Sequence, residues 1–188
     1  MQRNLILVIG KTGHGKSVWT KQYTARENRL IVYDPILSFE GVTWLDLDQF
    51  AEWLPTGAKT FRIGTGNSDD ADLFGEAAFA IGDCTYVCEE ASTLFDRRAN
   101  LAPWMRDLIF VGRHRAVNMI FVAQRAASIP IDVRSQADRV ISFAQHERDD
   151  LAALAPFLGE AVRELPALPP LHCLDYESGR IHRYKINF

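Results

Sequence analysis

The sequence predicts a three-layer α/β fold in which helices cover both faces of a mainly parallel central sheet, with a β-hairpin at the C-terminal end. Short apolar runs typical of buried strands recur along the chain, and segments with helical apolar spacing lie between them. A glycine-rich segment joins the first run to the first helical segment. Strands that alternate with helices in this way form parallel sheets.

The glycine-rich segment follows the apolar run at residues 5–9 and matches G-x-x-x-x-G-K-[ST] at every defined position. Glycines let backbone N–H groups converge on phosphate oxygens, and the N-terminus of the next helix favours the same negative charge. In this motif the lysine reaches the β- and γ-phosphates and the serine coordinates Mg²⁺. We therefore predict a P-loop that binds ATP and Mg²⁺ through Gly10, Lys11, Thr12, Gly13, His14, Gly15, Lys16 and Ser17.

The elements after the first helix alternate as the fold requires. Residues 30–33 form a strand that ends at Asp34-Pro35, because proline cannot donate to a strand ladder. Apolar residues at intervals of three and four predict a helix over 45–54, and residues 60–63 predict an edge strand. We expect Asp69 or Asp70 to cap the helix that ends near Ile81.

Two adjacent glutamates follow the next apolar strand, at residues 85–88. In P-loop hydrolases a carboxylate at the tip of such a strand holds Mg²⁺ through its water shell, and a following glutamate polarises the attacking water. We assign the metal role to Glu89 and the catalytic role to Glu90. Without the P-loop upstream, the same pair would more simply belong to a solvated loop.

A helix that begins at Pro103 runs into a Gly-Arg-His-Arg segment, and a buried strand at 118–123 ends at Gln124-Arg125. Ligands of open α/β sheets lie outside the carboxyl ends of the strands. Residues 10–17, 89–90 and 124–125 should therefore converge on one edge, where Gln124 can orient water or sense the γ-phosphate. A strand at 140–143 and a short helix around 149–154 follow.

Three prolines, at 166, 169 and 170, mark the end of the α/β core, which we place at residues 1–165. Alternating segments around Ser178-Gly179 predict a β-hairpin over 166–188, as an extension of the same domain. A chain of 188 residues that is 47% apolar can bury one sizeable core, so we expect no second catalytic domain.

The composition of the chain bears on its cellular location and on the partners that it can bind. No apolar run approaches the ~20 residues that span a bilayer, so we expect a cytoplasmic protein without stable membrane insertion. Three cysteines without paired spacing, Cys84, Cys88 and Cys173, predict free core thiols rather than a disulfide or a metal site. The net charge of −3 gives no argument for nucleic acid, but residues 91–139 hold eight arginines against four aspartates. An arginine-rich stretch of this kind either binds polyphosphate or nucleic acid or forms a solvated surface.

The order of these motifs resembles the FtsK/HerA branch of P-loop ATPases, and within it the small genome-packaging ATPases of viruses with internal membranes. The resemblance rests on residues 10–17, 87–91, 112–115 and 121–125 and covers roughly residues 4–145. It implies the additional-strand catalytic-glutamate type of P-loop fold, and a hexameric ring of identical subunits that moves double-stranded DNA through its pore. One departure concerns the metal position, because family members usually carry Asp-Glu where this chain has Glu89-Glu90.

The resemblance also implies roles for single residues and partners. Lys16, Ser17, Glu89, Glu90 and Gln124 take the family's nucleotide roles. An arginine of one subunit acts on the nucleotide of its neighbour, and Arg113 is our first choice for it, with Arg115 and Arg125 as rivals. A viral capsid or portal vertex would be the docking partner, in the host cytoplasm or on the virion.

Three other functions compete with this interpretation. A small kinase would suit the chain length, but it needs an acceptor pocket, and the Glu-Glu pair suits water activation better. A nucleotide-dependent switch is disfavoured, because the loose D-x-x-G match at residues 72–75 lies inside a predicted helix and no N-K-x-D follows. A phage assembly or secretion ATPase similar to zonula occludens toxin shares the Arg-His-Arg and Gln motifs, but the missing transmembrane segment argues against it.

Overall fold

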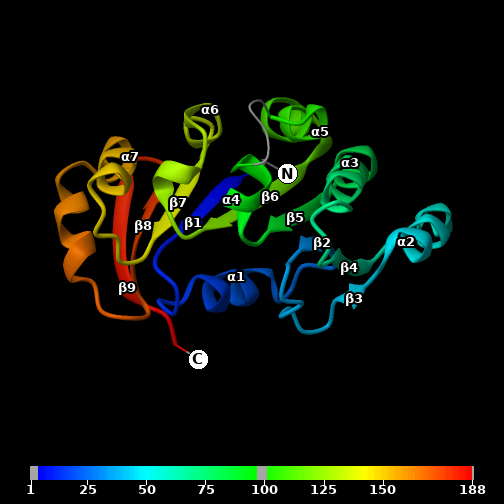
Figure 1. Cartoon of the computed structure of the whole chain (residues 1–188), viewed down its shortest axis with the longest axis horizontal. Coiled ribbons are helices and arrows are strands. Elements are labelled where there is room, and N and C mark those ends of the chain that lie inside the picture. The colour runs from blue at the N-terminus through cyan, green and yellow to red at the C-terminus, as the bar shows by residue number, and fades with distance from the viewer. Residues whose placement is uncertain (1–3, 97–100, 188) are drawn as a thin grey trace.

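The computed structural model contains a nine-stranded sheet with the strand order β3-β4-β2-β5-β6-β1-β7-β8-β9 (Figure 1). It describes residues 4–96 and 101–187, without the side chains of Pro55, Asp96 and Arg113. Neighbouring strands from β3 to β7 pair in parallel, whereas β8 is antiparallel to both β7 and β9. The predicted α/β class, with a mainly parallel sheet and a C-terminal hairpin, is confirmed.

The strands alternate with helices along most of the chain. The strands are β1 (Leu5–Ile9), β2 (Arg29–Tyr33), β3 (Thr43–Trp44), β4 (Phe61–Thr65), β5 (Cys84–Cys88), β6 (Val117–Ala123), β7 (Arg139–Ser142), β8 (His172–Glu177) and β9 (Arg180–Lys185). The α-helices are α1 (Lys16–Thr24), α2 (Leu47–Trp53), α3 (Ala71–Ile81), α4 (Ala91–Asp96), α5 (Pro103–Arg106), α6 (Ile131–Arg134) and α7 (Arg148–Leu158). Shorter helical segments are η1 (Leu54–Thr56), η2 (Asp107–Val111), η3 (Gly112–Arg115), η4 (Ala126–Ser128) and η5 (Gly159–Ala167).

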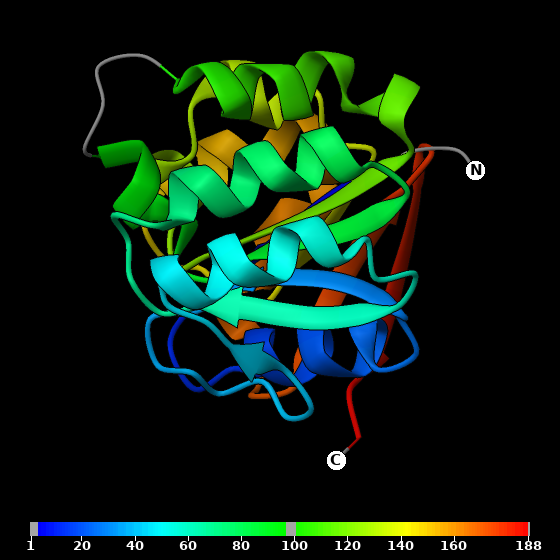
Figure 2. The ribbon, with the colours of Figure 1, turned by 90° about the vertical axis from the view of Figure 1, so that its right-hand side faces the viewer.

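Helices cover both faces of the sheet, which makes the three layers. α1 lies on one face, and α3, α5 and α6 lie on the other (Figures 1 and 2). The side chains of β1 alternate between these faces: Leu5, Leu7 and Ile9 join the cluster around α3, whereas Ile6 and Val8 join the cluster around Trp19 of α1. Burial on both faces explains why β1 is an unbroken apolar run.

Two sequence predictions at the β3 edge need correction. Residues 60–63 do not form an edge strand, because β4 pairs with β2 on one side and with β3 on the other. β3 has two residues, which is too short to produce a periodic signal. The helix predicted over 45–54 begins only at Leu47, because Asp46 caps it with a reciprocal capping box to Gln49.

Three helix predictions also differ in detail. Asp70 is the N-cap of α3, but its side chain makes no capping hydrogen bond there. The helix that begins at Pro103 changes to π-helical geometry over η2. α7 is longer than predicted and contains Pro156, because Leu154 and Leu158 continue its buried stripe past the proline.

The three cysteines are buried free thiols, as predicted. Burial raises the pKa of Cys84 and of Cys173 to about 12, so neither thiol is a nucleophile near neutral pH. Within residues 4–96 and 101–187, no helix is both long and apolar enough to cross a membrane.

Candidate functional site

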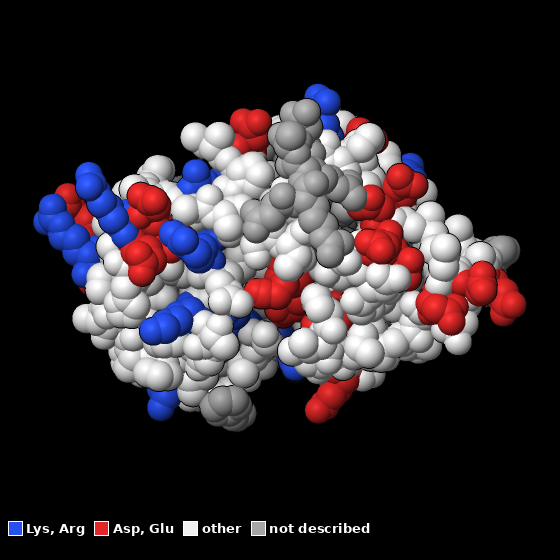
Figure 3. All heavy atoms as spheres, viewed as in Figure 1, with Lys and Arg blue, Asp and Glu red and all other residues white. Residues whose placement is uncertain are grey.

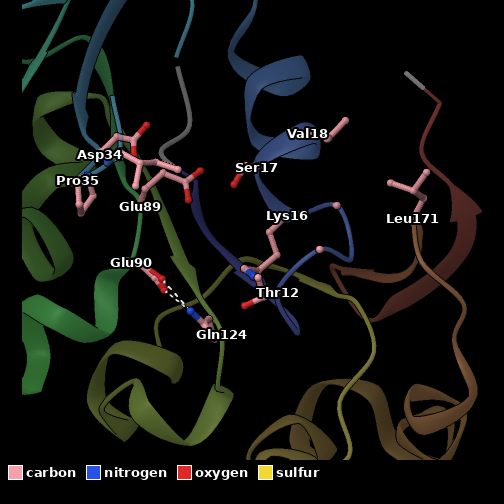
Figure 4. A pocket seen from close by; sticks show the side chains of 13 residues that line it. Thr12, Lys16, Ser17, Val18, Asp34, Pro35, Glu89, Glu90, Gln124 and Leu171 are labelled. Atoms are coloured by element: carbon pink, nitrogen blue, oxygen red, sulfur yellow. Dashed lines mark hydrogen bonds between the residues drawn. The ribbon is translucent and has the colours of Figure 1, made fainter. Parts of the chain in front are cut away.

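The P-loop connects β1 to α1 and curls over the carboxyl end of the sheet (Figure 4). Gly10 must lack a side chain, because a Cβ there would lie 2.5 Å from the Cβ of Phe143. Gly15 has φ +111° and would bring a Cβ to 3.0 Å from Leu171, so both its backbone and its surroundings require glycine. The shape of the loop therefore depends on its contacts with Phe143 and Leu171 as well as on its own sequence.

The N-terminus of α1 is open to an anion. Gly15 caps the helix without a side-chain hydrogen bond, and the first turn carries no acidic residue. Lys16 Nζ lies 3.4 Å from the Lys11 carbonyl oxygen, and burial lowers the lysine pKa, against the opposite influence of Glu90 and Glu89. The N–H groups of the first helical turn, the helix dipole and one cation together suit a phosphate.

The remaining P-loop residues differ in what they face. Thr12, Gly13 and Ser17 line a cavity of about 380 Å³ together with Lys16. Lys11 is exposed, and its N–H donates to the Ala144 carbonyl oxygen at 3.3 Å. His14 is half-buried, and burial and neighbouring Lys11 lower its pKa. These contacts divide the loop into residues that face the ligand space and residues that hold the loop.

Glu89 is the buried member of the acidic pair. It follows β5, its N–H donates to the Tyr33 carbonyl oxygen at 2.9 Å, and 7% of its surface is exposed. Burial, reinforced by the charge of Asp34 and opposed by that of Lys16, raises the Glu89 pKa to about 7. Its Oε1 is buried without a hydrogen-bond partner.

This orphaned oxygen supports the assignment of Glu89 to Mg²⁺. Mg²⁺ is held by one or two carboxylates together with substrate phosphates and water rather than by a cage of protein ligands. Accordingly, among the described residues no group of three or more His, Cys, Asp and Glu side chains could hold a metal ion alone. Glu89 and Ser17 line the same cavity and have the oxygen chemistry that Mg²⁺ requires, so the residues fit the ion.

Glu90 and Gln124 form a direct pair across the ends of β5 and β6. Gln124 Nε2 donates to Glu90 Oε1 at 2.9 Å and lies 3.3 Å from Oε2, as the dashed line in Figure 4 shows. Glu90 adopts the left-handed backbone with φ +55°, and its side chain lies apart from that of Glu89 (Figure 4). Two of the four predicted catalytic residues, Glu90 and Gln124, therefore meet, and both line the same cavity as Lys16.

Asp34 belongs to this site but was not among the predicted site residues. It follows β2, which pairs with β5, and only 1% of its surface is exposed. Its carboxylate accepts hydrogen bonds from Ile36 N–H at 3.1 Å and from Ser38 N–H at 2.7 Å, so it also shapes the turn beside the cavity. The rule that polar residues at carboxyl strand ends face the ligand would have identified Asp34, because it follows an apolar strand as Glu89 does.

Leu171 is a second residue that the sequence did not indicate. It precedes β8, more than 150 positions from the P-loop, yet its N–H donates to the His14 carbonyl oxygen at 3.0 Å. Its side chain lines the nucleotide cavity opposite Asp34 and Pro35 (Figure 4). No local signal in the sequence predicts such a contact, because it depends on how the C-terminal hairpin docks.

The three candidate arginines have different surroundings. The backbone of Arg113 lies in η3, before β6 and thus at the amino edge of the sheet, opposite the P-loop, and its side chain is outside the described residues. Arg115 donates from Nε to the Phe79 carbonyl oxygen at 3.0 Å and also to the Ala80 carbonyl oxygen. Arg125 pairs with the buried carboxylate of Asp150 at 3.1 Å.

Comparison with solved structures identifies the fold. The genome packaging NTPase B204 of Sulfolobus turreted icosahedral virus 2, in complex with AMPPCP, matches with a TM-score of 0.80 and 20% identity over 97% of both chains. This chain has the fold of B204. No family model matches the sequence, and neither does any curated protein.

Two further structures share the core of this fold. The pCW3 conjugation coupling protein TcpA matches with a TM-score of 0.65 and 15% identity, over 98% of this chain and 60% of that chain. The N-terminal domain of zonular occludens toxin from Neisseria meningitidis matches with a TM-score of 0.57 and 12% identity, over 100% of this chain and 95% of that domain. The fold expected from the resemblance, which is the fold of the genome packaging NTPase B204, is therefore confirmed.

Proposed function

We propose that this protein is an ATP hydrolase that moves double-stranded DNA, as the genome-packaging motor of a virus. The observation that carries the hydrolase part is the Glu90–Gln124 pair beside Lys16 and Glu89 in one cavity. A P-loop alone binds a triphosphate. A carboxylate held by an amide next to that loop adds a group that can take a proton from water.

Each residue has one task in the proposed reaction. Lys16 and the N–H groups at the start of α1 hold the β- and γ-phosphate oxygens. Ser17 and Glu89 hold Mg²⁺, which when bound neutralises phosphate charge. Glu90 accepts a proton from the attacking water, and Gln124 orients that water and the carboxylate.

Hydrolysis needs a second cation near the γ-phosphate, and the described residues that line the cavity do not provide one. Among the described residues that line the cavity, Lys16 alone is positively charged. Arginines supplied by a neighbour accelerate triphosphate hydrolysis by roughly 10³ to 10⁵. We assign this role to Arg113, because η3 and the P-loop lie on opposite edges of the sheet. A head-to-tail arrangement of copies, closing as a hexameric ring, would bring the two edges together.

Mixing inactive subunits tests the trans assignment. Arg113→Ala subunits keep a P-loop, and Lys16→Ala subunits keep the arginine. Each variant alone should be inactive, whereas mixtures should recover part of the ATPase activity, because some interfaces then pair an intact P-loop with an intact arginine. Full activity of Arg113→Ala alone would contradict the assignment and move the search to Arg115 and Arg125.

Charge limits where duplex DNA can lie. Residues 34–83 contain ten acidic and two basic residues, a net charge of −8, and they build β3, α2, β4 and α3. Figure 3 shows acidic side chains gathered over this end of the molecule, and Lys and Arg side chains more frequent at the opposite end. Since phosphate contacts dominate DNA affinity, we place the DNA away from α2 and α3.

The packaging role is preferred over the alternatives for structural reasons. The match to B204 covers nearly all of both chains at a TM-score of 0.80, against 0.57 for the toxin domain. B204 is a genome packaging NTPase, and by analogy we expect a capsid or portal vertex as docking partner and the host cytoplasm as the place of action. A kinase is disfavoured, because the Glu90–Gln124 pair beside the P-loop suits the activation of water better than phosphate transfer to an acceptor.

The deciding experiment is ATP hydrolysis with and without linear duplex DNA, with Lys16→Ala as the inactive control. A packaging motor should turn over ATP faster with DNA, and this stimulation should fall steeply as salt rises. ATPase activity that ignores duplex DNA would exclude the motor and favour an assembly ATPase. Phosphate transfer to an acceptor other than water would exclude the hydrolase.

A further inference from the structure

Residues 143–145, which directly follow β7, form hydrogen bonds both to the P-loop region and to the end of β6. Phe143 N–H donates to the Ile9 carbonyl oxygen at 2.8 Å, and the Ala144 carbonyl oxygen accepts from Lys11 N–H at 3.3 Å. The next side chain, Gln145, donates from Nε2 to the Gln124 carbonyl oxygen at 2.7 Å. One short segment therefore contacts the P-loop with its backbone and the end of β6 with a side chain.

This reach is possible because of Gly10. β1 lies between β6 and β7 in the sheet, so a side chain from the end of β7 must pass the end of β1 to meet β6. β1 ends just before Gly10, where a Cβ would collide with Phe143 at 2.5 Å. The missing side chain at Gly10 lets the β7 extension approach, and Gln145 then spans to Gln124.

The hydrogen bond from Gln145 acts on Gln124, whose side chain has few other contacts to fix its direction. The Gln124 side chain is exposed, so packing does not fix its direction toward Glu90. Gln145 itself is 4% exposed and is therefore held by its surroundings. After Gln124 in the chain, Arg125 Nε and Ala127 N–H donate hydrogen bonds to the buried Asp150 carboxylate at 3.1 Å and 2.9 Å. Two buried polar side chains thus hold the backbone around Gln124.

We propose that Gln145 is a positioning residue for hydrolysis, a proposal that rests on the function proposed above. Its amide fixes the backbone of Gln124, and through it the direction of the Gln124 side chain toward Glu90. Since the same segment bonds to Lys11 in the P-loop, the water-orienting pair keeps a defined position relative to the phosphate site. Gln145 touches no reacting atom in this scheme and acts through Gln124.

The first test uses Gln145→Met, which keeps the length of the side chain and removes the donor. Gln136→Met, at an exposed glutamine, is the matched control. We expect Gln145→Met to lower kcat for ATP about 10-fold or more, as loss of positioning does. The KM for ATP and the affinity for a non-hydrolysable analogue should stay within about twofold of wild type. An unchanged kcat, or a loss of analogue affinity as large as the loss of kcat, would overturn the proposal.

A double variant separates positioning from general loss of structure. In a Gln124→Ala background the side chain that Gln145 directs is absent, so adding Gln145→Met should lower kcat no further. An additional loss equal to that of the single variant would show a role that does not pass through Gln124 and would overturn the proposal.

A third measurement does not depend on hydrolysis. The side-chain amide signals of Gln124 in an NMR spectrum of the nucleotide-free protein should move in Gln145→Met and stay in place in Gln136→Met. Unchanged Gln124 signals would refute the positioning role, even if the wild-type protein hydrolyses no ATP. Absent hydrolysis with the expected signal changes would instead overturn the proposed function alone.

Discussion

The two edges of the parallel sheet use charged side chains in opposite ways. At the amino edge, Arg29 donates to the carbonyl oxygens of Asp83 at 2.6 Å and Gly82 at 3.1 Å, and the Asp138 carboxylate accepts Leu5 N–H at 2.7 Å. At the carboxyl edge, Glu89 Oε1 is buried without a partner. Lys16 there has its pKa lowered by burial.

The difference shows what each edge contributes. Charged groups that satisfy backbone carbonyl and N–H groups stabilise the fold, because an unpaired buried polar group costs about 1–3 kcal/mol. Charged groups that lie buried without full pairing destabilise the free protein and are available to a ligand of the opposite charge. Substitutions of Lys16 and Glu90 at the carboxyl edge should therefore change activity, whereas substitution of a backbone-paired arginine at the amino edge, such as Arg115, should change stability.

Lys16→Ala should have the largest effect at the carboxyl edge. It removes the cation at the β- and γ-phosphates, and truncating one partner of a buried charge pair costs about 2–5 kcal/mol. ATP affinity should fall by roughly 10² to 10³, with loss of turnover, while the protein stays folded. Calorimetric titration with ATP and Mg²⁺ measures this, and near-normal affinity would refute the phosphate site.

Glu90→Gln should separate binding from chemistry. The amide keeps the shape of the side chain but accepts no proton, so hydrolysis should fall by about 10² to 10⁴ while ATP binding persists. Glu89→Gln is the comparison, because it should weaken Mg²⁺-dependent binding instead. If Glu89→Gln bound ATP normally and failed to hydrolyse it, the two glutamates would have exchanged roles.

The raised pKa of Glu89 predicts a pH-dependent stability of the nucleotide-free protein. Below the ordinary value of 4.5 the carboxyl is protonated in both states, and between 4.5 and about 7 only the unfolded chain releases the proton. The free energy of unfolding should therefore fall over this range, by about 3 kcal/mol at most, and change no further above pH 7 through this group.

Urea denaturation at a series of pH values, without nucleotide or Mg²⁺, measures this slope. Glu89→Gln should flatten it, and Glu160→Gln, at a side chain 83% exposed, should not. An identical slope in wild type and Glu89→Gln would show that the carboxyl has no such shift.

Arg115→Ala should have the smallest effect and only at the level of stability. It removes donors to the carbonyl oxygens of Phe79 and Ala80 at the end of α3, and we expect a loss of about 1–2 kcal/mol. Arg163→Ala is the control, because that arginine is 79% exposed and its ion pair with Glu160 should contribute little. At a temperature where Arg115→Ala is folded, its ATPase activity should match that of the wild type. A loss of this activity would instead assign to Arg115 the role of the arginine that acts on the nucleotide of the adjacent subunit.

The sequence by itself determined the features that depend on adjacent residues. The P-loop is contiguous, the apolar runs mark the buried strands, and Glu89, Glu90 and Gln124 directly follow such runs. Because the carboxyl ends of parallel strands lie at one edge of the sheet, the sequence predicts that these positions lie close together. The class of the fold followed from the alternation of strands and helices, and most of the candidate site followed from the P-loop motif together with this rule.

The tertiary structure decided the contacts between segments that are distant in the chain. Leu171 reaches the P-loop through the docking of the hairpin, and Gln145 reaches Gln124 by passing the end of β1 at Gly10. The partners of Arg115 and Arg125 likewise come from other elements. Such pairings depend on strand order and packing, which local spacing does not encode, because a single polar residue looks the same in the sequence whatever it faces in the fold.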